Sequence, residues 1–330
     1  GRLTGAMARI DRFLSLLLLC GGCALTGCPE CRTAERTGNP GSAASAAGSG
    51  FAAEPESGVP GAAGFRLPDV PAALRDPADR ADYLALHYWD HFDFADTASI
   101  ARPEVSEQAF VDFLSVLPYT RNAAAAVDTL YTRAAVGTEV LYYFIGLGDK
   151  YLYEPNSPMR DEQLHILMLR SLIANPRIGE VDKLRPRSLL EIALKNRPGD
   201  RAADFSFLGR DGCDRRMSQL EAEYTLLYFY DPTCDECERV KTQLASSPTI
   251  CTMVRSGRLT VLSVSVAGGA AWRGMAVPQG WTDGCDASER LVRDGVYDLK
   301  AMPTLYLLDS GKRVLLKDAS AGQVEARLGE

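Results

Sequence analysis

The sequence predicts an all-α domain followed by an α/β domain with a central mixed sheet flanked by helices. Three observations support this fold class. Apolar residues recur at helical spacing between residues 67 and 200, without the alternation typical of strands. From residue 201 onward, short apolar runs alternate with helical segments, which indicates a sheet covered by helices. Within this second part, the aromatic run 224–230 is followed by a Cys-x-x-Cys pair, Cys234 and Cys237, that opens a helical segment.

Length and composition are those of a folded protein with about two domains after an export signal is removed. The chain has 330 residues, of which 46% are hydrophobic and 24% charged. Its formal net charge is −7, and the two signs are interspersed without a basic block. Nucleic acid is therefore not an expected partner.

The beginning of the chain has the layout of a secretory signal. Met7 is followed by two arginines, a short apolar run over residues 13–20, and the sequence Leu-Thr-Gly-Cys at 25–28. The run is too short to span a membrane as a helix. The ending resembles a bacterial lipobox, which implies that Cys28 is acylated, attaches the chain to a membrane and becomes the mature N-terminus. A plain signal peptide that is cleaved elsewhere is the alternative.

We assign residues 1–27 to upstream residues and this signal peptide, and residues 28–66 to a disordered tether. The tether is dominated by Gly, Ala, Ser, Pro and Glu, and such a composition cannot bury enough apolar surface to offset its ordering entropy. Export places the folded part in an oxidising compartment, where disulfide chemistry is possible. The expected location is the cell envelope, facing the periplasm.

Residues 67–200 form the predicted helical domain. Asp76 offers an N-cap with Pro77 at the first helical position, and the helix would continue through Trp89. Further helices are predicted over 106–117, 122–136, 139–147, 161–174 and 188–195.

Two histidines in the first of these helices have a spacing that can bind a metal. His87 and His91 lie four residues apart, with Asp90 and Asp93 nearby. The chain contains one further histidine, His165, and no glutamate follows His87 directly. We therefore interpret the pair as part of a polar helix surface and expect no metal site.

Residues 201–330 form the predicted α/β domain. Strands are expected over 203–207, 224–230, 259–266, 305–308 and 313–316. The strands 224–230 and 259–266 should be parallel, because a helical crossover separates them. The last two should form an antiparallel hairpin. The long segment 267–300 is interpreted as an insertion that contains a helix and covers one edge of the site.

The Cys-x-x-Cys pair is the main candidate for chemistry. A strand followed by a turn at Asp231 delivers Cys234 to the first turn of a helix, where free backbone N–H groups and the helix dipole stabilise a thiolate. Cys237 lies one turn further, close enough to form a disulfide with it. Asp235 and Glu236 add negative charge that disfavours the thiolate, so we expect a comparatively stable disulfide and a reductant or isomerase.

These residues resemble the thioredoxin superfamily, specifically membrane-anchored thioredoxin-like proteins of the bacterial periplasm. The resemblance rests on Ala-Asp-Phe at 203–205, Cys234 with Cys237, and Met-Pro-Thr at 302–304. The arrangement of lipobox, tether, helical domain and thioredoxin-like end is similar to bacterial lipoproteins whose helical domain has no assigned function. It implies that Pro303 is a cis proline facing the cysteines.

The resemblance further implies that Thr233, Met302, Pro303 and Thr304 contact the substrate chain. Two positions depart from the family pattern. Thr233 stands where a tryptophan is usual before the first cysteine, and Tyr228 occupies the place of a buried acid that assists proton transfer. Proton transfer would then need another acid or water.

Three classes of function follow. In a thiol-disulfide oxidoreductase, Cys234 attacks a protein disulfide and Cys237 resolves the mixed disulfide, with an upstream electron donor as second partner and no cofactor. Alternatively, the protein is a noncatalytic partner-binding lipoprotein in which Cys234 and Cys237 form a structural disulfide. Copper or zinc delivery is the third class, disfavoured because the C-terminal part has no second Cys pair and no histidine.

The remaining cysteines of the C-terminal part are Cys213, Cys251 and Cys285. An odd number in an oxidising compartment indicates buried free thiols, or one bridge and one free thiol. A bridge between Cys251 and Cys285 is the pairing we expect if one forms, with Cys213 free.

Overall fold

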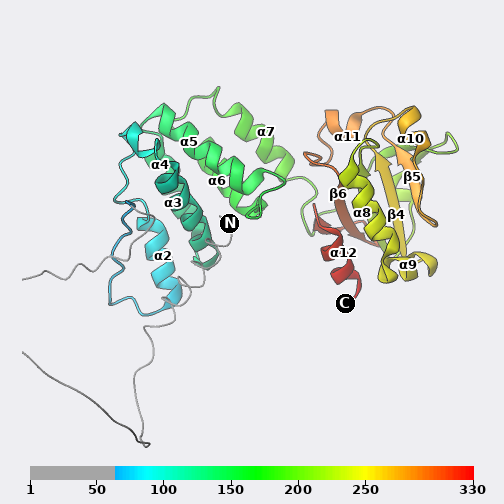
Figure 1. The fold of residues 1–330 in the computed structure, drawn as a ribbon, viewed down its shortest axis with the longest axis horizontal. Helices are drawn as coiled ribbons and strands as arrows, with labels where there is room; N and C mark the ends of the chain where they lie inside the picture. Colours follow the sequence, from blue (N-terminus) through cyan, green and yellow to red (C-terminus); the bar gives the residue numbers. More distant parts are fainter. Residues whose placement is uncertain (1–63) are drawn as a thin grey trace, which may run out of the picture. The chain divides into compact units, whose positions relative to one another are not determined.

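The computed structural model describes residues 64–330 (Figure 1). These residues form two compact units, the first ending at Leu147 and the second covering Gly148–Glu330. The predicted signal peptide, the lipid site at Cys28 and almost all of the predicted tether lie outside the described residues. Within residues 64–330, no helix is long and apolar enough to cross a membrane.

The described part of the first unit is helical. Its α-helices are α2 (Pro77–His87), α3 (Pro103–Val116), α4 (Ala123–Ala134) and α5 (Thr138–Gly148). Asp76 caps α2 by accepting hydrogen bonds from the backbone of Ala78 and Asp79, which confirms the predicted helix start. The core is aromatic: the rings of Trp89, Phe113 and Phe144 are almost fully buried, and the Trp89 centroid lies 5.6 and 5.2 Å from the other two.

The second unit begins with a short π-helix over Asp149–Tyr153, followed by the helices α6 (Glu162–Ala174) and α7 (Leu184–Ala193). A seven-stranded sheet follows. The strands are β1 (Ser206–Gly209), β2 (Asp214–Arg216), β3 (Tyr224–Tyr230), β4 (Leu259–Ser265), β5 (Thr282–Cys285), β6 (Thr304–Asp309) and β7 (Val314–Lys317). Their order is β2-β1-β5-β4-β3-β6-β7. The pairs β3–β4 and β4–β5 are parallel and the others antiparallel, so the sheet is mixed, as predicted.

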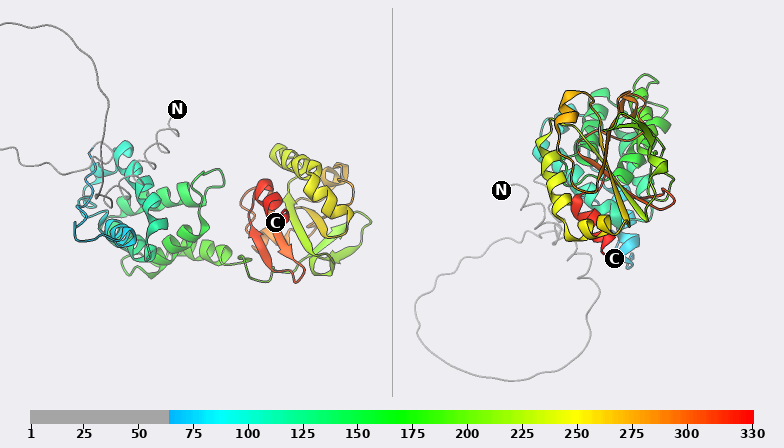
Figure 2. Two further views of the ribbon diagram at one scale, coloured as in Figure 1. Left: turned by 90° about the horizontal axis from the view of Figure 1, so that it is seen from below. Right: turned by 90° about the vertical axis from the view of Figure 1, so that its right-hand side faces the viewer.

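Helices cover the sheet on both sides. They are α8 (Asp235–Ser246), α9 (Pro248–Arg255), α10 (Ala270–Gly274), α11 (Arg290–Arg293) and α12 (Ala321–Leu328), the last coloured red beside the sheet (Figures 1 and 2). Successive residues of β3 point to opposite faces. Tyr228 joins a core with side chains of α8, α9 and α12, whereas Phe229 joins a core with Leu291 and Tyr297. The buried centre of the sheet is therefore the rigid support of the β3–α8 junction.

The segment 267–300 is more than a covering insertion. It contains the expected helical turns, α10 and α11, but also β5, which the sequence pattern did not predict. Its residues Thr-Asp-Gly-Cys carry no apolar run, and the strand forms because it pairs with β4 on one side and β1 on the other. Gly284 is needed there, since a Cβ atom would lie 2.4 Å from the ring of Phe207.

The change from helices to strands lies near residue 200, the predicted domain boundary. The second compact unit, however, begins at Gly148, so α6 and α7 are grouped with the sheet. Buried polar contacts account for this grouping. Lys317 of β7, whose side chain is 4% exposed, donates hydrogen bonds to the carbonyl oxygens of Ala193 and Lys195 at the end of α7.

Candidate functional site

The site is built at the junction between β3 and α8. The strand ends at Tyr230, and Asp231 forms the turn by accepting hydrogen bonds from the backbone N–H and the hydroxyl of Thr233, both at 2.7 Å. The carbonyl of Asp231 also accepts from the N–H of Cys234 at 3.2 Å. This local turn fixes the position at which Cys234 enters α8.

Cys234 is the N-cap residue of α8. Its sulfur accepts a hydrogen bond from the backbone N–H of Cys237 at 3.1 Å, in the place where a serine or aspartate oxygen usually caps a helix. A thiolate is a better acceptor than a thiol, so this contact and the positive end of the helix dipole both favour the reactive form. The sulfur is half-buried, which leaves it accessible to a substrate.

Cys237 has the opposite surroundings. It is 2% exposed, and burial, together with a hydrogen bond that its thiol donates to the sulfur of Cys234, raises the pKa of that thiol to about 12. The two cysteines are both free in this structure, which therefore represents the reduced pair. One accessible sulfur and one buried, protonated sulfur are thus held a single helical turn apart.

The loop before β6 faces this pair. The Met302–Pro303 peptide bond is cis, and the carbonyl oxygen of Met302 lies 3.6 Å from the sulfur of Cys234. Met302 and Pro303 are half-buried and Thr233 is exposed, so these three border the accessible sulfur. Thr304 is buried, and its hydroxyl donates to the carbonyl of Ala301 at 2.6 Å, so its side chain faces the protein interior.

The two acids between the cysteines differ in their environment. Glu236 forms an ion pair with Arg239, with 2.8 Å between Oε2 and Nε, and this hydrogen bond lowers the pKa of its carboxyl. Asp235 is exposed and has no ion-pair partner among residues 64–330. Asp235 is therefore the acid whose charge near Cys234 is not offset by a paired cation.

Tyr228, on β3, makes a contact with the pair that the sequence pattern did not reveal. Its hydroxyl donates a hydrogen bond of 2.6 Å to the carbonyl oxygen of Cys237, and its side chain is fully buried. Burial first, and the neighbouring Cys237 second, raise the pKa of this phenol well above its usual range. Tyr228 therefore anchors the first turn of α8 and cannot act as a base at neutral pH.

A buried acid lies further along the same face of the sheet. Asp283 on β5 accepts hydrogen bonds from Ser263, Tyr230 and Trp272 at 2.6, 3.1 and 2.8 Å, and pairs with Arg210 at 2.8 Å. These four contacts hold the carboxylate in a fixed position at the sheet. We therefore assign it a structural role, and water remains the candidate for proton transfer at the cysteines.

Of the two alternatives for the remaining cysteines, the structure has free thiols, and the bridge between Cys251 and Cys285 does not form. Among residues 64–330 all five cysteines are free, and the thiol of Cys251 contacts the carbonyl of Ala245 at 3.1 Å. The reason is the topology: α9, which carries Cys251, leads into the start of β4, whereas Cys285 pairs with Ser265 at the end of β4. Cys213 is exposed and free, in agreement with the sequence prediction.

The histidines of the helical part have local partners. His87 hydrogen-bonds Asp90 at 2.8 Å, and Asp90 also pairs with Arg133. The part of the chain described by the structure contains no group of three or more His, Cys, Asp or Glu side chains that could hold a metal ion.

Known structures were compared with this fold. A thioredoxin-like protein from Bacteroides caccae is 38% identical, with 81% of this chain and 98% of that chain covered and a TM-score of 0.74. The chain belongs to the thioredoxin-like family. In addition, residues 32–196 match the family described as a domain of unknown function, DUF5106.

Two further structures are each similar to about 40% of the chain. A conserved protein of unknown function from Bacteroides fragilis is 38% identical over 40% of this chain and 98% of that one, with a TM-score of 0.39. The thioredoxin domain of a thiol-disulfide oxidoreductase from Bacteroides vulgatus is 18% identical over 40% and 98%, with a TM-score of 0.35. No curated protein matches the chain.

Proposed function

We propose that this protein is a thiol-disulfide oxidoreductase that acts as a reductase or isomerase on protein disulfides. The observation that carries the proposal is the asymmetry of the cysteine pair. The accessible sulfur of Cys234 caps α8 and accepts the N–H of Cys237, whereas the thiol of Cys237 is buried and protonated. Nucleophilic attack and resolution need such a division between two sulfurs.

The reaction proceeds in two exchanges. The Cys234 thiolate attacks one sulfur of a substrate disulfide, a mixed disulfide forms, and the other substrate sulfur leaves as a thiolate. Cys237 then loses its proton to water and attacks Cys234, which forms the Cys234–Cys237 disulfide and releases the second substrate thiolate. Two electrons have passed to the substrate, so an upstream dithiol donor must reduce the pair before another turnover.

Substrate docking uses the loop that faces the cysteines. The carbonyl of Met302 lies beside the accessible sulfur, Pro303 follows it and Thr233 precedes Cys234, and the backbone here would pair with an extended segment of the substrate. Thr304 would contribute through its backbone, because its side chain is buried.

The proposed location is the bacterial cell envelope, with a lipid on Cys28 and the folded part facing the periplasm. The support is the signal layout and the sequence Leu-Thr-Gly-Cys at 25–28. An oxidising compartment contains disulfide-bonded substrates. A reductase that works there needs electrons from a membrane-bound donor.

Reduction of insulin in a glutathione buffer tests the function. The wild-type protein should accelerate reduction, and Cys234→Ser should abolish the acceleration. Cys237→Ser should accumulate mixed disulfides on Cys234, which would identify substrates in cells. Cys213→Ser is the matched control, because this exposed cysteine lies outside the pair. A wild-type protein without activity, whose Cys234–Cys237 disulfide only alters stability, would instead support the noncatalytic alternative.

A further inference from the structure

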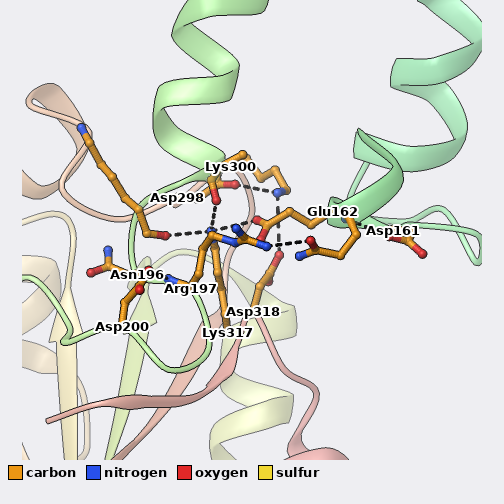
Figure 3. Close-up of polar contacts among 12 residues, drawn as sticks. Asp161, Glu162, Asn196, Arg197, Asp200, Asp298, Lys300, Lys317 and Asp318 are labelled. Atoms are coloured by element: carbon orange, nitrogen blue, oxygen red, sulfur yellow. Dashed lines mark hydrogen bonds and ion pairs between the residues drawn. The ribbon is translucent and has the colours of Figure 1, made fainter. Parts of the chain in front are cut away.

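The loop that carries Met302 is held from its outer side by the segment that precedes the sheet. This loop, residues 296–303, runs from the end of the long insertion to the start of β6. Polar side chains from 153–197 contact it and the adjoining turn between β7 and α12 (Figure 3). These contacts join parts of the second unit that lie more than 100 residues apart in sequence.

Arg160, just before α6, holds the turn after β7. Its Nη1 lies 2.8 Å from the carboxylate of Asp318, and its Nη2 donates to the carbonyl oxygen of the same residue at 3.1 Å. The next residue, Ala319, donates its N–H to the carbonyl of Leu305 on β6 at 3.1 Å. Arg160 therefore fixes a turn that is itself bonded to the strand following the Met302 loop.

Lys300 continues this chain of contacts into the loop. Its Nζ lies 2.7 Å from Asp298 and 3.8 Å from Asp318, and 4.8 Å from the centre of the Tyr153 ring. Asp318 is thus shared between Arg160 and Lys300, and Figure 3 shows its side chain beside that of Lys300. Lys300 stands two residues before Met302, so the ion pairs end close to the carbonyl that faces Cys234.

The beginning of the same loop is fixed separately. Lys195 donates to the carbonyl of Gly295 at 3.1 Å, and Asn196 donates to the carbonyl of Val296 at 2.8 Å. Lys317, 4% exposed, pairs with Glu162 at 2.8 Å and ties β7 to α6. These contacts hold the surroundings of the loop in place even when the Arg160 contact is removed.

The loop packs against the core through Val296, Tyr297 and Leu299, whereas ion pairs and a cavity lie on its outer side. A cavity of about 230 Å³ lies there, and its walls include Tyr153, His165, Lys300, Asp318 and Gln323. An unfilled cavity offers few van der Waals contacts, so on this outer side the ion pairs of Lys300 and Asp318 supply the contacts that restrain the loop.

We propose that Arg160 is a positioning residue, which acts through Asp318 and Lys300 to hold the Met302 loop for docking of a polypeptide substrate. The inference rests on the proposed function and deepens it. A polypeptide must pair with the loop over several residues, whereas a small aromatic disulfide needs access to Cys234 alone. Loss of the contact should therefore weaken polypeptide docking and leave the chemistry of the cysteine pair unchanged.

The test compares Arg160→Gln with the wild type in the full chain. We expect the KM for insulin to rise about three- to tenfold, a change typical of weakened binding by a partly buried contact, with the rate on a small aromatic disulfide and the redox potential unchanged. Arg160→Lys should restore part of the affinity, because it keeps the charge but loses the paired geometry. Asp318→Asn, which removes the shared carboxylate, should reproduce the effect.

Arg258→Gln is the matched control. Arg258 forms a bidentate ion pair with Glu223, at 2.6 and 2.9 Å, at the opposite end of β3 from the cysteines.

Hydrogen exchange of the amides of 296–303 supplies a readout that does not depend on activity. The exchange should accelerate several-fold in Arg160→Gln and stay unchanged in Arg258→Gln. Unchanged exchange in both Arg160→Gln and Asp318→Asn would overturn the positioning role. Inactivity of the wild type on insulin would refute the proposed function instead, and the exchange data would still decide the role of Arg160.

Discussion

At the scale of single residues, Cys237 has the most altered chemistry in the site. Burial raises the pKa of its thiol to about 12, far above the roughly 8.5 of an ordinary cysteine. Because only the thiolate reacts, iodoacetamide should label Cys234 first in the reduced protein. Labelling of Cys237 should rise about tenfold per pH unit from pH 8 to 11, since each unit increases the small thiolate fraction tenfold below the pKa.

The stability of the reduced protein should follow the same titration. Between the unfolded pKa of about 8.5 and the folded value of about 12, the unfolded chain has released the Cys237 proton and the folded chain has kept it. The stabilising contribution is therefore complete below about pH 8.5 and is lost as pH rises toward 12. Equal iodoacetamide labelling of Cys234 and Cys237 in the folded, reduced protein would contradict the raised pKa assigned to Cys237.

The hydroxyl of Tyr228 gives a second prediction at this scale. Tyr228→Phe removes the 2.6 Å hydrogen bond to the carbonyl of Cys237 and should lower the free energy of unfolding by about 1 kcal/mol. Tyr306→Phe is the matched control, because the buried Tyr306 hydroxyl has no hydrogen-bond partner among residues 64–330. That variant should be neutral or more stable by up to about 1 kcal/mol, since it removes an unsatisfied polar group.

Urea unfolding of both tyrosine variants at neutral pH measures the difference. We expect the midpoint to fall for Tyr228→Phe and to stay or rise for Tyr306→Phe, with similar slopes for the two. A larger loss in Tyr306→Phe than in Tyr228→Phe would refute the role assigned to the Cys237 carbonyl contact.

At the scale of elements, the dipole of α8 acts both on the acidic side chains of its first turn and on the sulfur at its N-cap. Acidic side chains in its first turn stabilise the helix, but they disfavour a thiolate at its N-cap. The sequence suggested that Asp235 and Glu236 contribute alike. The structure separates them, because the charge of Arg239 offsets that of Glu236.

Asp235→Asn should therefore make the redox potential less negative by about 10 to 20 mV, because removing its charge stabilises the Cys234 thiolate and hence the reduced form. Glu236→Gln combined with Arg239→Gln removes a neutral pair and should change the potential by less than about 5 mV. Equilibration with glutathione buffers gives both values. The wild type should lie at about −200 to −270 mV, and a value above about −150 mV would indicate an oxidase instead.

Local patterns predicted the elements that depend on local chemistry. The strand 224–230 was predicted with its observed bounds, the predicted N-cap Asp76 lies at the start of α2, and the helix predicted over 161–174 corresponds to α6. By contrast, β5 depends on its neighbours in the sheet and carries no pattern of its own. The helix α12 could have been predicted, because Ser320 and Gln323 form a capping box.

The same limit applies to the site. The spacing of Cys234 and Cys237 and the family resemblance indicated the pair and its facing loop. The contact between Tyr228 and Cys237 depends on how α8 lies over β3, and the pairing of Arg239 with Glu236 depends on side-chain rotamers. Neither follows from spacing alone, so the sequence supplied the chemistry of the site but not its electrostatic balance.

At the scale of the whole molecule, the second compact unit begins at Gly148 and so contains α6 and α7, whereas the sequence prediction placed both helices in the domain 67–200. Contacts such as that of Lys317 with Glu162 join residues whose positions along the chain gave no sign of proximity. The matched domain of unknown function covers residues 32–196 and thus includes both helices. Through the Arg160 contact, part of that domain would influence how the thioredoxin-like part receives its substrate.

The proposed lipid on Cys28 leads to the last prediction. In cells, the wild type should sediment with membranes, whereas Cys28→Ala should move to the soluble fraction, because the substitution removes the sulfur that would carry the lipid. A single acyl chain gives only marginal membrane binding, so firm sedimentation would indicate more than one chain on this cysteine. Cys31→Ala is the matched control and should stay with the membrane, since Cys31 lies three residues beyond the lipid site. Complete retention of Cys28→Ala in the membrane fraction would refute the anchor, and insulin reduction by the released protein would show that the chemistry does not depend on it.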